Sequence, residues 1–226
     1  VAAGLKSRNA KLDEIILTDV CPYTLGTQIG RRDPNGQIHN GYFHPIILRN
    51  STVPISREDM FYPMNDQQHQ LTIDIYQGEN PLVANNIKLG EITLDLDKRR
   101  RSDENGVTVR FTYDINGLLQ VEVTEHATQR RHELLLEQNP GLLSPEEIRT
   151  RLAALAELKI HPRDQQENIA VLARAERLYE EFLHDRNQLQ EWIMHFRAIL
   201  DTQDVAMIAR HRTQLAEALD ALEAQA

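Results

Sequence analysis

Few residues of this chain have the type and spacing that catalysis requires. Cys21 is the only cysteine. It precedes Pro22 without a supporting motif, and because an active thiol needs exposure and a lowered pKa, we interpret it as a packed bystander. The nine histidines are scattered and show no metal-binding spacing with a carboxylate. Asp95 and Asp97 are the one carboxylate pair that would suit a hydrolase, and we expect both to face water at a strand end.

The sequence gives equally little evidence for a loop that binds phosphate or presents a nucleophile. The stretch Gly26–Gly30 is not followed by Lys and Ser or Thr, as a phosphate-binding loop would be. There is no Gly-x-Ser-x-Gly turn. The basic run Lys98–Arg101 is typical of a solvated turn, here between two strands. These residues favour a binding module over an enzyme without showing what is bound.

The bulk composition excludes several classes of protein. The chain has 226 residues and a formal net charge of -9, which argues against binding nucleic acid or an anionic membrane surface. It contains no apolar run near the ~20 residues that span a bilayer. A single cysteine favours a reducing compartment, and we expect the cytoplasm. The start, Val1–Lys11, has no signal-peptide pattern and resembles the middle of a protein, so we expect a fragment.

The first part of the chain has the alternation of β-strands. Apolar residues recur at every second position, which places one face on a core and the other toward water. Asn-Gly pairs, which suit two-residue hairpin turns, separate some of these runs. The alternating positions are Leu71, Ile73 and Ile75; Ile92, Leu94 and Leu96; Val107, Val109, Phe111 and Tyr113; and Leu119, Val121 and Val123. The pairs are at positions 35–36, 40–41, 105–106 and 116–117.

From Ser144 onward the pattern is helical. Ser144 can cap the backbone N–H groups of a first turn, Pro145 suits that turn, and Glu147 completes a capping box. Pro162 is expected to end or kink this helix. Further apolar stripes follow at helical spacing. They are Ile148, Leu152 and Leu155; Ile169, Leu172, Tyr179 and Leu183, widened by Leu178 and Phe182; Leu189, Ile193, Phe196 and Leu200; and Val205, Ile208, Leu215, Leu219 and Leu222. Strands followed by helices in separate blocks predict an α+β chain that changes near Pro140.

Several sequence blocks resemble one known family. In order and nearly in spacing they are similar to the DnaK-type chaperones, the seventy-kilodalton heat-shock family. The cysteine of the first strand, the insert before Phe43 and the stretch Lys159–Asp164 resemble its divergent bacterial HscC-type branch. The blocks are Leu12–Val20, Cys21–Gly26, Arg49–Pro54, Tyr76–Glu79, Leu89–Gly90 and Asp114–Val121.

The resemblance implies three parts. Residues 1–19 would be the end of an ATPase domain and the interdomain linker, with Ile15, Ile16 and Leu17 docking on that domain. Residues 20–138 would form an antiparallel β-sandwich that binds peptide, and residues 139–226 an α-helical lid. The implied function is to hold extended apolar segments of unfolded proteins, under the control of ATP and magnesium bound elsewhere in the full-length protein. The chain itself would need no cofactor and would not be an enzyme.

The implied partners are unfolded polypeptides, the protein's own ATPase domain and a J-domain co-chaperone in the bacterial cytoplasm. Self-association through the apolar linker or the helices is also expected, because exposed apolar patches adhere. The alternative is a structural or oligomerisation module that binds no peptide.

The residues that match the family's peptide channel come from several strands. Leu71 matches the floor of the central pocket, although Leu71, Ile73 and Val107 would have the same pattern if they faced the sandwich core. Met64 matches one side of an arch over the peptide. Gly30 matches the other side, and because Gly cannot cover a peptide, the insert before Phe43 leaves Arg31, Ile38 or Tyr42 as substitutes. The channel residues are Thr27, Ile29, Phe61, Met64, Leu71, Ile73 and Val107.

The resemblance also implies contacts that latch the lid. Glu176 matches the acidic lid residue, and Arg101, beside the matching position, would be its partner. Asp66 matches the loop residue of a second latch, but Glu180 stands where that latch has a histidine. Because two carboxylates repel, we expect the second latch to be lost and the lid to open easily.

Overall fold

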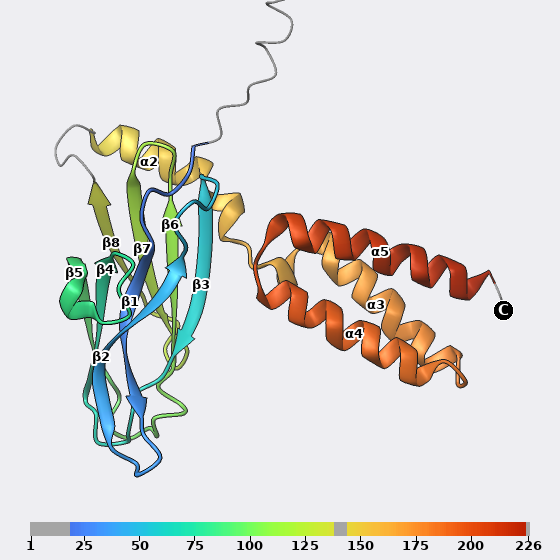
Figure 1. The fold of residues 1–226 in the computed structure, drawn as a ribbon, viewed down its shortest axis with the longest axis horizontal. Helices are drawn as coiled ribbons and strands as arrows, with labels where there is room; N and C mark the ends of the chain where they lie inside the picture. Colours follow the sequence, from blue (N-terminus) through green and yellow to red (C-terminus); the bar gives the residue numbers. More distant parts are fainter. Residues whose placement is uncertain (1–18, 138–143, 225–226) are drawn as a thin grey trace, which may run out of the picture. The chain divides into compact units, whose positions relative to one another are not determined.

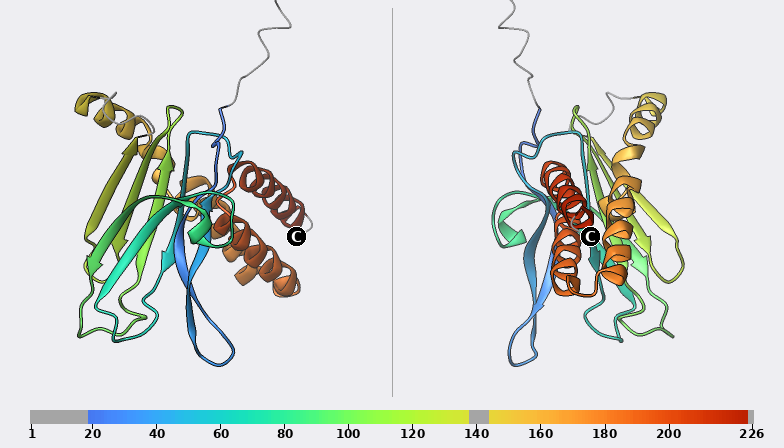
Figure 2. Two further views of the ribbon diagram at one scale, coloured as in Figure 1. Left: turned by 60° about the vertical axis from the view of Figure 1, so that its left-hand side comes forward. Right: turned by 90° about the vertical axis from the view of Figure 1, so that its right-hand side faces the viewer.

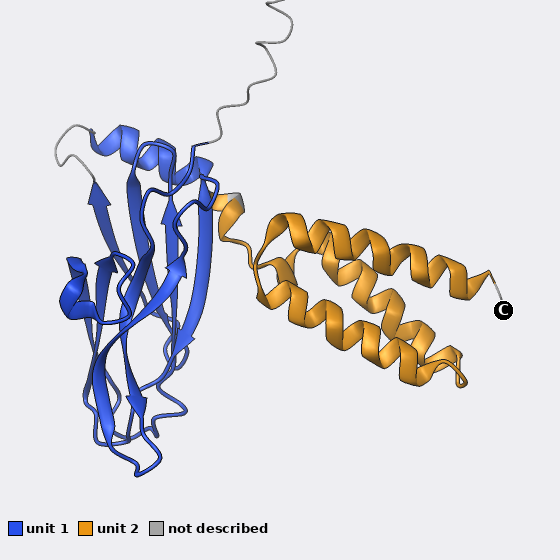
Figure 3. Cartoon of the chain, viewed as in Figure 1, with its two compact units in different colours: residues 1–155 blue, residues 156–226 orange. Residues whose placement is uncertain are grey.

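A computed structural model describes residues 19–137 and 144–224, apart from the side chain of Glu157. The linker positions Ile15, Ile16 and Leu17 lie outside the described residues. The chain divides into two compact units, residues 1–155 and 156–226 (Figure 3). Each unit has its own hydrophobic core and is described by itself.

The first unit is built from two antiparallel sheets of four strands, which pack face to face (Figures 1 and 2). The α+β fold with a β-sandwich is therefore confirmed. The first sheet has the order β2 (Ile38–Ile47), β1 (Leu25–Arg32), β4 (Gln70–Gln77) and β5 (Ile87–Asp95). The second has the order β3 (Ile55–Phe61), β6 (Val107–Tyr113), β7 (Leu118–Glu125) and β8 (Arg131–Glu137).

The alternating residues of both sheets form one core. Leu71, Ile73 and Ile75 of β4 are buried, and so are the inward residues of β6 and β7. Phe111 is completely buried at the centre of this cluster. Along β5 and β8 the sheets approach closely, because a Cβ added to Gly90 would lie 2.9 Å from Leu134 Cδ2. A larger residue at this position would have to displace the end of the Leu134 side chain.

Two of the four Asn-Gly pairs occupy hairpin turns. Gly36 (φ +83°) and Gly117 (φ +82°) follow β1 and β6, where a left-handed residue is required. The other two expectations were wrong. Gly41 lies inside β2, also at positive φ, and Gly106 directly precedes β6. Asn-Gly signals a local backbone conformation, which an irregular strand can use as well as a turn.

A carboxylate fastens the start of β1 to the turn after β4. Glu79 accepts hydrogen bonds from the Thr24 backbone N–H at 2.9 Å and from the Thr24 hydroxyl at 2.8 Å. The backbone hydrogen bond from Thr24, followed by the hydroxyl, holds the pKa of Glu79 below its ordinary value of 4.5.

The stability of the sandwich is expected to depend on Glu79 at acid pH. Because its pKa is lower in the folded state, its contribution is complete above pH ~4.5 and is lost as pH falls through the folded value. Glu79→Gln should therefore lower the melting temperature at pH 7 and flatten its decline toward pH 3. Circular dichroism melts at both pH values would measure this. Equal pH slopes for both proteins would contradict the prediction.

The helix α2 (Pro145–Ala154) begins with the predicted capping box. The Glu147 backbone N–H donates to the Ser144 hydroxyl, and the Glu147 carboxylate accepts from the Ser144 backbone N–H. Arg151 pairs with the buried Asp114 of the β6–β7 turn at 3.5 Å. The helix thus belongs with the sandwich, and the division into compact units falls after Leu155. The predicted boundary at residues 138 and 139 lies outside the described residues.

The second unit contains three longer helices, α3 (Gln166–Glu181), α4 (Arg186–Asp201) and α5 (Val205–Glu223). Short 3-10 turns, η2 (Ala156–Lys159) and η3 (Pro162–Asp164), precede them. The expectation that Pro162 ends or kinks the first helix was wrong, because α2 already ends at Ala154 and Pro162 begins η3 instead. A further 3-10 turn, η1 (Val83–Asn85), lies in the sandwich. The core of the bundle contains Val171, Ala175 and Leu178; Leu189, Ile193, Phe196 and Leu200; and Ile208, Leu215 and Leu219.

Three residues of the stripes predicted for α3 to α5 lie outside this core. Ile169 is 41% exposed, Leu183 64% and Val205 73%. In α3 the buried positions follow Val171, Ala175 and Leu178, a face that small residues such as Ala175 help to define. The predicted stripe was chosen from the largest apolar residues and passed over Ala175, so its centre was displaced around the helix from the face that is buried. No helix in the described part of the chain is long and apolar enough to cross a membrane.

Candidate functional site

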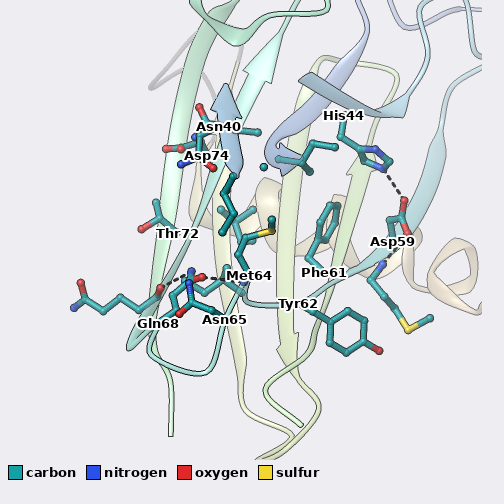
Figure 4. Close-up of a pocket in the computed structure, with 18 residues that line it drawn as sticks. Asn40, His44, Asp59, Phe61, Tyr62, Met64, Asn65, Gln68, Thr72 and Asp74 are labelled. Atoms are coloured by element: carbon teal, nitrogen blue, oxygen red, sulfur yellow. Dashed lines mark hydrogen bonds and ion pairs between the residues drawn. The ribbon is translucent and has the colours of Figure 1, made fainter. Parts of the chain in front are cut away.

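A pocket of about 630 Å³ opens beside β1 and β4 in the sandwich unit (Figure 4). Residues of β1, β2, β3 and β4 line it, together with the loop between β3 and β4. Figure 4 shows His44 and Asp59 on one wall, Thr72 and Asp74 on the opposite wall, and Met64 and Phe61 between them. Residues far apart in the chain therefore meet around one cavity.

Five of the seven predicted channel residues line this pocket. The five residues are Ile29, Phe61, Met64, Leu71 and Ile73. Leu71 and Ile73 also belong to the sandwich core, so their side chains contribute to the core and to the lining of the pocket. Their role in binding stays a prediction.

The structure places Thr27 and Val107 elsewhere. Thr27 is completely buried, and its hydroxyl donates to the Asp74 carbonyl at 2.7 Å. Val107 is 1% exposed within the sandwich core and borders a separate pocket of about 230 Å³. Neither residue is among those that line the larger pocket.

The pocket occupies the place where β1 and β4 separate. These strands pair at Leu25 with Gln77, Gly26 with Tyr76 and Thr27 with Ile75. Beyond Thr27, β1 continues to pair with β2, with a shift of register between Ile29 and Arg31, while the earlier part of β4 pairs with β5. The lining stretches 28–30 and 70–74 are the diverging parts of the two strands. The divergence creates a groove in an otherwise continuous sheet.

Met64 lies over one end of this groove. Its side-chain methyl would be 3.5 Å from a Cβ added to Gly30, an ordinary van der Waals distance, so Met64 lies beside Gly30. Its backbone N–H donates to Gln68 Oε1 at 3.0 Å, and its carbonyl accepts from Arg32 Nη2 at 3.1 Å. The expected substitutes for the second arch residue did not include Arg32. Whether the Arg32 side chain can reach the Met64 carbonyl depends on the path of the β1–β2 hairpin.

A hydrogen-bonded pair on the opposite wall was missed by the sequence analysis. His44 Nε2 of β2 and Asp59 Oδ2 of β3 are 2.7 Å apart. The hydrogen bond to His44 lowers the pKa of Asp59 and keeps it ionised. The His44 ring also contacts Phe61 edge-on, with 5.5 Å between ring centroids. Because the two residues lie on strands of different sheets, no local pattern in the sequence signals their contact.

Comparison with known proteins identifies the family. A family model described as Hsp70 protein matches residues 1–226. The chain belongs to the Hsp70 family. Its relatives include the chaperone protein DnaK of Mycoplasmopsis pulmonis, 28% identical over 167 residues, and that of Mycoplasma mobile, 29% identical over 197 residues. A heat shock protein of Pyricularia oryzae is 32% identical over 162 residues.

These alignments cover 74%, 85% and 70% of this Hsp70 chain but 26%, 30% and 25% of the respective relatives. The chain therefore spans less than a third of the length of the curated Hsp70 relatives it matches. The family assignment concerns the chain, and the activity of a whole Hsp70 protein is a separate question.

The residues of the proposed Hsp70 latches have other partners within each unit. Asp66 Oδ1 accepts from the Ser102 backbone N–H at 2.6 Å, and this bond lowers the pKa of Asp66. Arg101 lies 3.5 Å from Asp103. In the helical unit, Arg197 donates to Glu176 at 2.6 Å. The latch between Glu176 and Arg101 stays a prediction, and it would compete with these local contacts.

The residues with possible catalytic chemistry are held in ordinary structural contacts. Cys21 is 1% exposed, its thiol donates to the Tyr23 carbonyl, and burial raises its pKa. This is the environment of a packed thiol. Asp95 accepts a hydrogen bond from Gln70, and Asp97 pairs with Arg100. Among the described residues, no group of three or more His, Cys, Asp or Glu side chains is suited to hold a metal ion.

Proposed function

We propose that this chain is the part of an Hsp70 chaperone that holds an extended, apolar segment of an unfolded polypeptide. The observation that carries the proposal is the groove between β1 and β4, which combines diverging strand edges with apolar side chains. An extended peptide could add to such an edge through its main chain and place one aliphatic side chain against Leu71 and Ile29. Membership of the Hsp70 family supports the same function.

Backbone groups on β4 suit this type of binding. The carbonyls of Asp74 and Gln70 accept hydrogen bonds from the side chains of Thr27 and Gln68, at 2.7 Å and 2.8 Å. Because alternate residues of a strand direct their backbone groups to the same side, Thr72 presents its N–H and C=O in the same direction. An added strand would meet the backbone N–H and C=O of Thr72. Such backbone groups can bind the main chain of any peptide sequence.

The proposal extends to the whole protein. There, ATP and magnesium would act outside the described residues, and an ATPase domain and a J-domain co-chaperone would control when the peptide is held. The bacterial cytoplasm and the DnaK-type HscC branch are part of the same proposal. The helical unit would act as the lid.

A fluorescence anisotropy titration tests peptide binding. The probe is a labelled, extended peptide with a central leucine flanked by basic residues. We expect a Kd in the micromolar range, about −8 kcal/mol. Ile29→Asp places a charge in the groove and should weaken binding by more than about tenfold, because an apolar contact becomes a buried charge.

The matched control is Ile87→Asp, which makes the same change at a residue that is 63% exposed and outside the groove. It should bind as the wild type does. A folded wild-type protein that binds no peptide, or equal binding by both variants, would contradict the proposal and favour a structural or oligomerisation module.

A further inference from the structure

Arg32 joins the β1–β2 hairpin to the loop between β3 and β4. It is the last residue of β1, and its guanidinium donates through Nη1 to the Gly36 carbonyl at 3.3 Å and through Nη2 to the Met64 carbonyl at 3.1 Å. Gly36 lies in the β1–β2 hairpin, and Met64 lies in the loop between β3 and β4. One side chain therefore bridges segments that are 32 residues apart along the chain.

The bridge determines where the Met64 side chain lies. Arg32 holds the Met64 carbonyl while Gln68 holds its N–H, so hydrogen bonds fix the backbone on both sides of this residue. The Met64 side chain points into the pocket (Figure 4) and approaches Gly30 of β1. Release of the carbonyl would free the loop to swing away from β1 and carry Met64 with it.

We propose that Arg32 controls how fast peptides enter and leave the groove. The proposal rests on the proposed function and adds a residue that sets the exchange rate. A hydrogen bond that is present in the free and the bound protein, but broken while the peptide passes, raises both barriers equally. Its loss would accelerate association and dissociation by the same factor and leave the affinity nearly unchanged.

The neighbouring residue Arg31, one of the expected substitutes for the second arch residue, does not line the pocket and therefore provides a matched control. Its guanidinium lies 5.0 Å from the centroid of the Tyr42 ring, a contact between adjacent strands of the hairpin. Successive side chains of a strand point to opposite faces, so Arg31 and Arg32 have different surroundings. Replacing either residue by alanine removes the same charge from the same hairpin, but only Arg32→Ala removes the bridge to Met64.

Stopped-flow anisotropy with the labelled leucine peptide would measure both rates in the 226-residue chain. For Arg32→Ala we expect both rates to rise about fivefold, the effect of losing one exposed hydrogen bond from a charged group, with Kd within about twofold of wild type. Arg31→Ala should have wild-type rates. Equal rates for the two variants, or a change confined to dissociation, would overturn the proposal.

Hydrogen exchange of residues 62–70 in the free protein tests the bridge without any peptide. Protection of this loop should fall in Arg32→Ala and stay unchanged in Arg31→Ala, while unchanged protection in both variants would overturn the role of Arg32. If the wild type binds no peptide, the proposed function fails and the exchange role fails with it. The loop protection would still show whether Arg32 holds Met64.

Discussion

Phe196→Ala should destabilise the helical unit by about 3–5 kcal/mol and leave the sandwich unchanged. Phe196 is 1% exposed at the centre of the bundle core, between residues of α3 and α5. The sandwich has a separate core in which Phe111 is completely buried. Because the two cores share no residues, we expect the loss of packing in one to have little effect on the other.

The single tryptophan makes this prediction measurable. Trp192 lies on α4 against the bundle core, so its fluorescence reports unfolding of the helical unit. Far-UV circular dichroism follows both units. Met194→Ala is the control, because Met194 is 63% exposed on the same helix and its loss should change stability by less than about 0.5 kcal/mol. If Phe196→Ala lowered both transitions by the same amount, the division into independent units would be wrong.

Leu71→Asp should abolish peptide binding, with a loss greater than about 100-fold. The change removes an apolar contact worth roughly 1.5–3 kcal/mol and places a charge where the peptide side chain would be buried. Leu71 is 9% exposed and belongs to the core as well as the pocket. The variant should also melt at a lower temperature, so binding must be measured below its transition, by the same anisotropy titration.

The control for this loss of stability is Leu94→Asp. Leu94 lies directly opposite Leu71 in the β4–β5 pairing and in the same core, but it is not among the residues that line the pocket. Both variants should be destabilised, and only Leu71→Asp should lose the peptide. If Leu71→Asp does not fold, Leu71→Ala against Leu94→Ala makes the same comparison with a smaller effect. Equal binding by a folded pair would show that the groove is not the binding site.

Strands with a strict apolar alternation were predictable from the sequence. β4, β6 and β7 follow the pattern because each has one face on the core. β2 and β3 do not follow it. Both are edge strands, β2 has few buried residues, and β3 has adjacent charged residues at Arg57–Asp59. An edge strand with little buried surface has no reason to alternate, so its existence depends on partners distant in sequence.

The site was predictable to a smaller extent. Of the seven channel residues predicted from the match to the family, five line the pocket, whereas Thr27 and Val107 are buried away from it. The bridge from Arg32 to Met64 has no local signal. It depends on the length of the β1–β2 hairpin and on how this hairpin bends toward a loop that follows much later in the chain. Such contacts become visible only in three dimensions.

The two long borders of the sandwich differ in mechanical strength. At the β5–β8 border, Gly90 admits the Leu134 side chain so closely that the sheets are in tight apolar contact. At the β2–β3 border, beside the pocket, the half-exposed pair of His44 and Asp59 joins the sheets. Packed apolar contacts exclude water from the border, whereas a half-exposed hydrogen bond competes with water and contributes little net stability. The two sheets should therefore separate first at the β2–β3 border, beside the groove, and stay in contact longest at the β5–β8 border around Gly90.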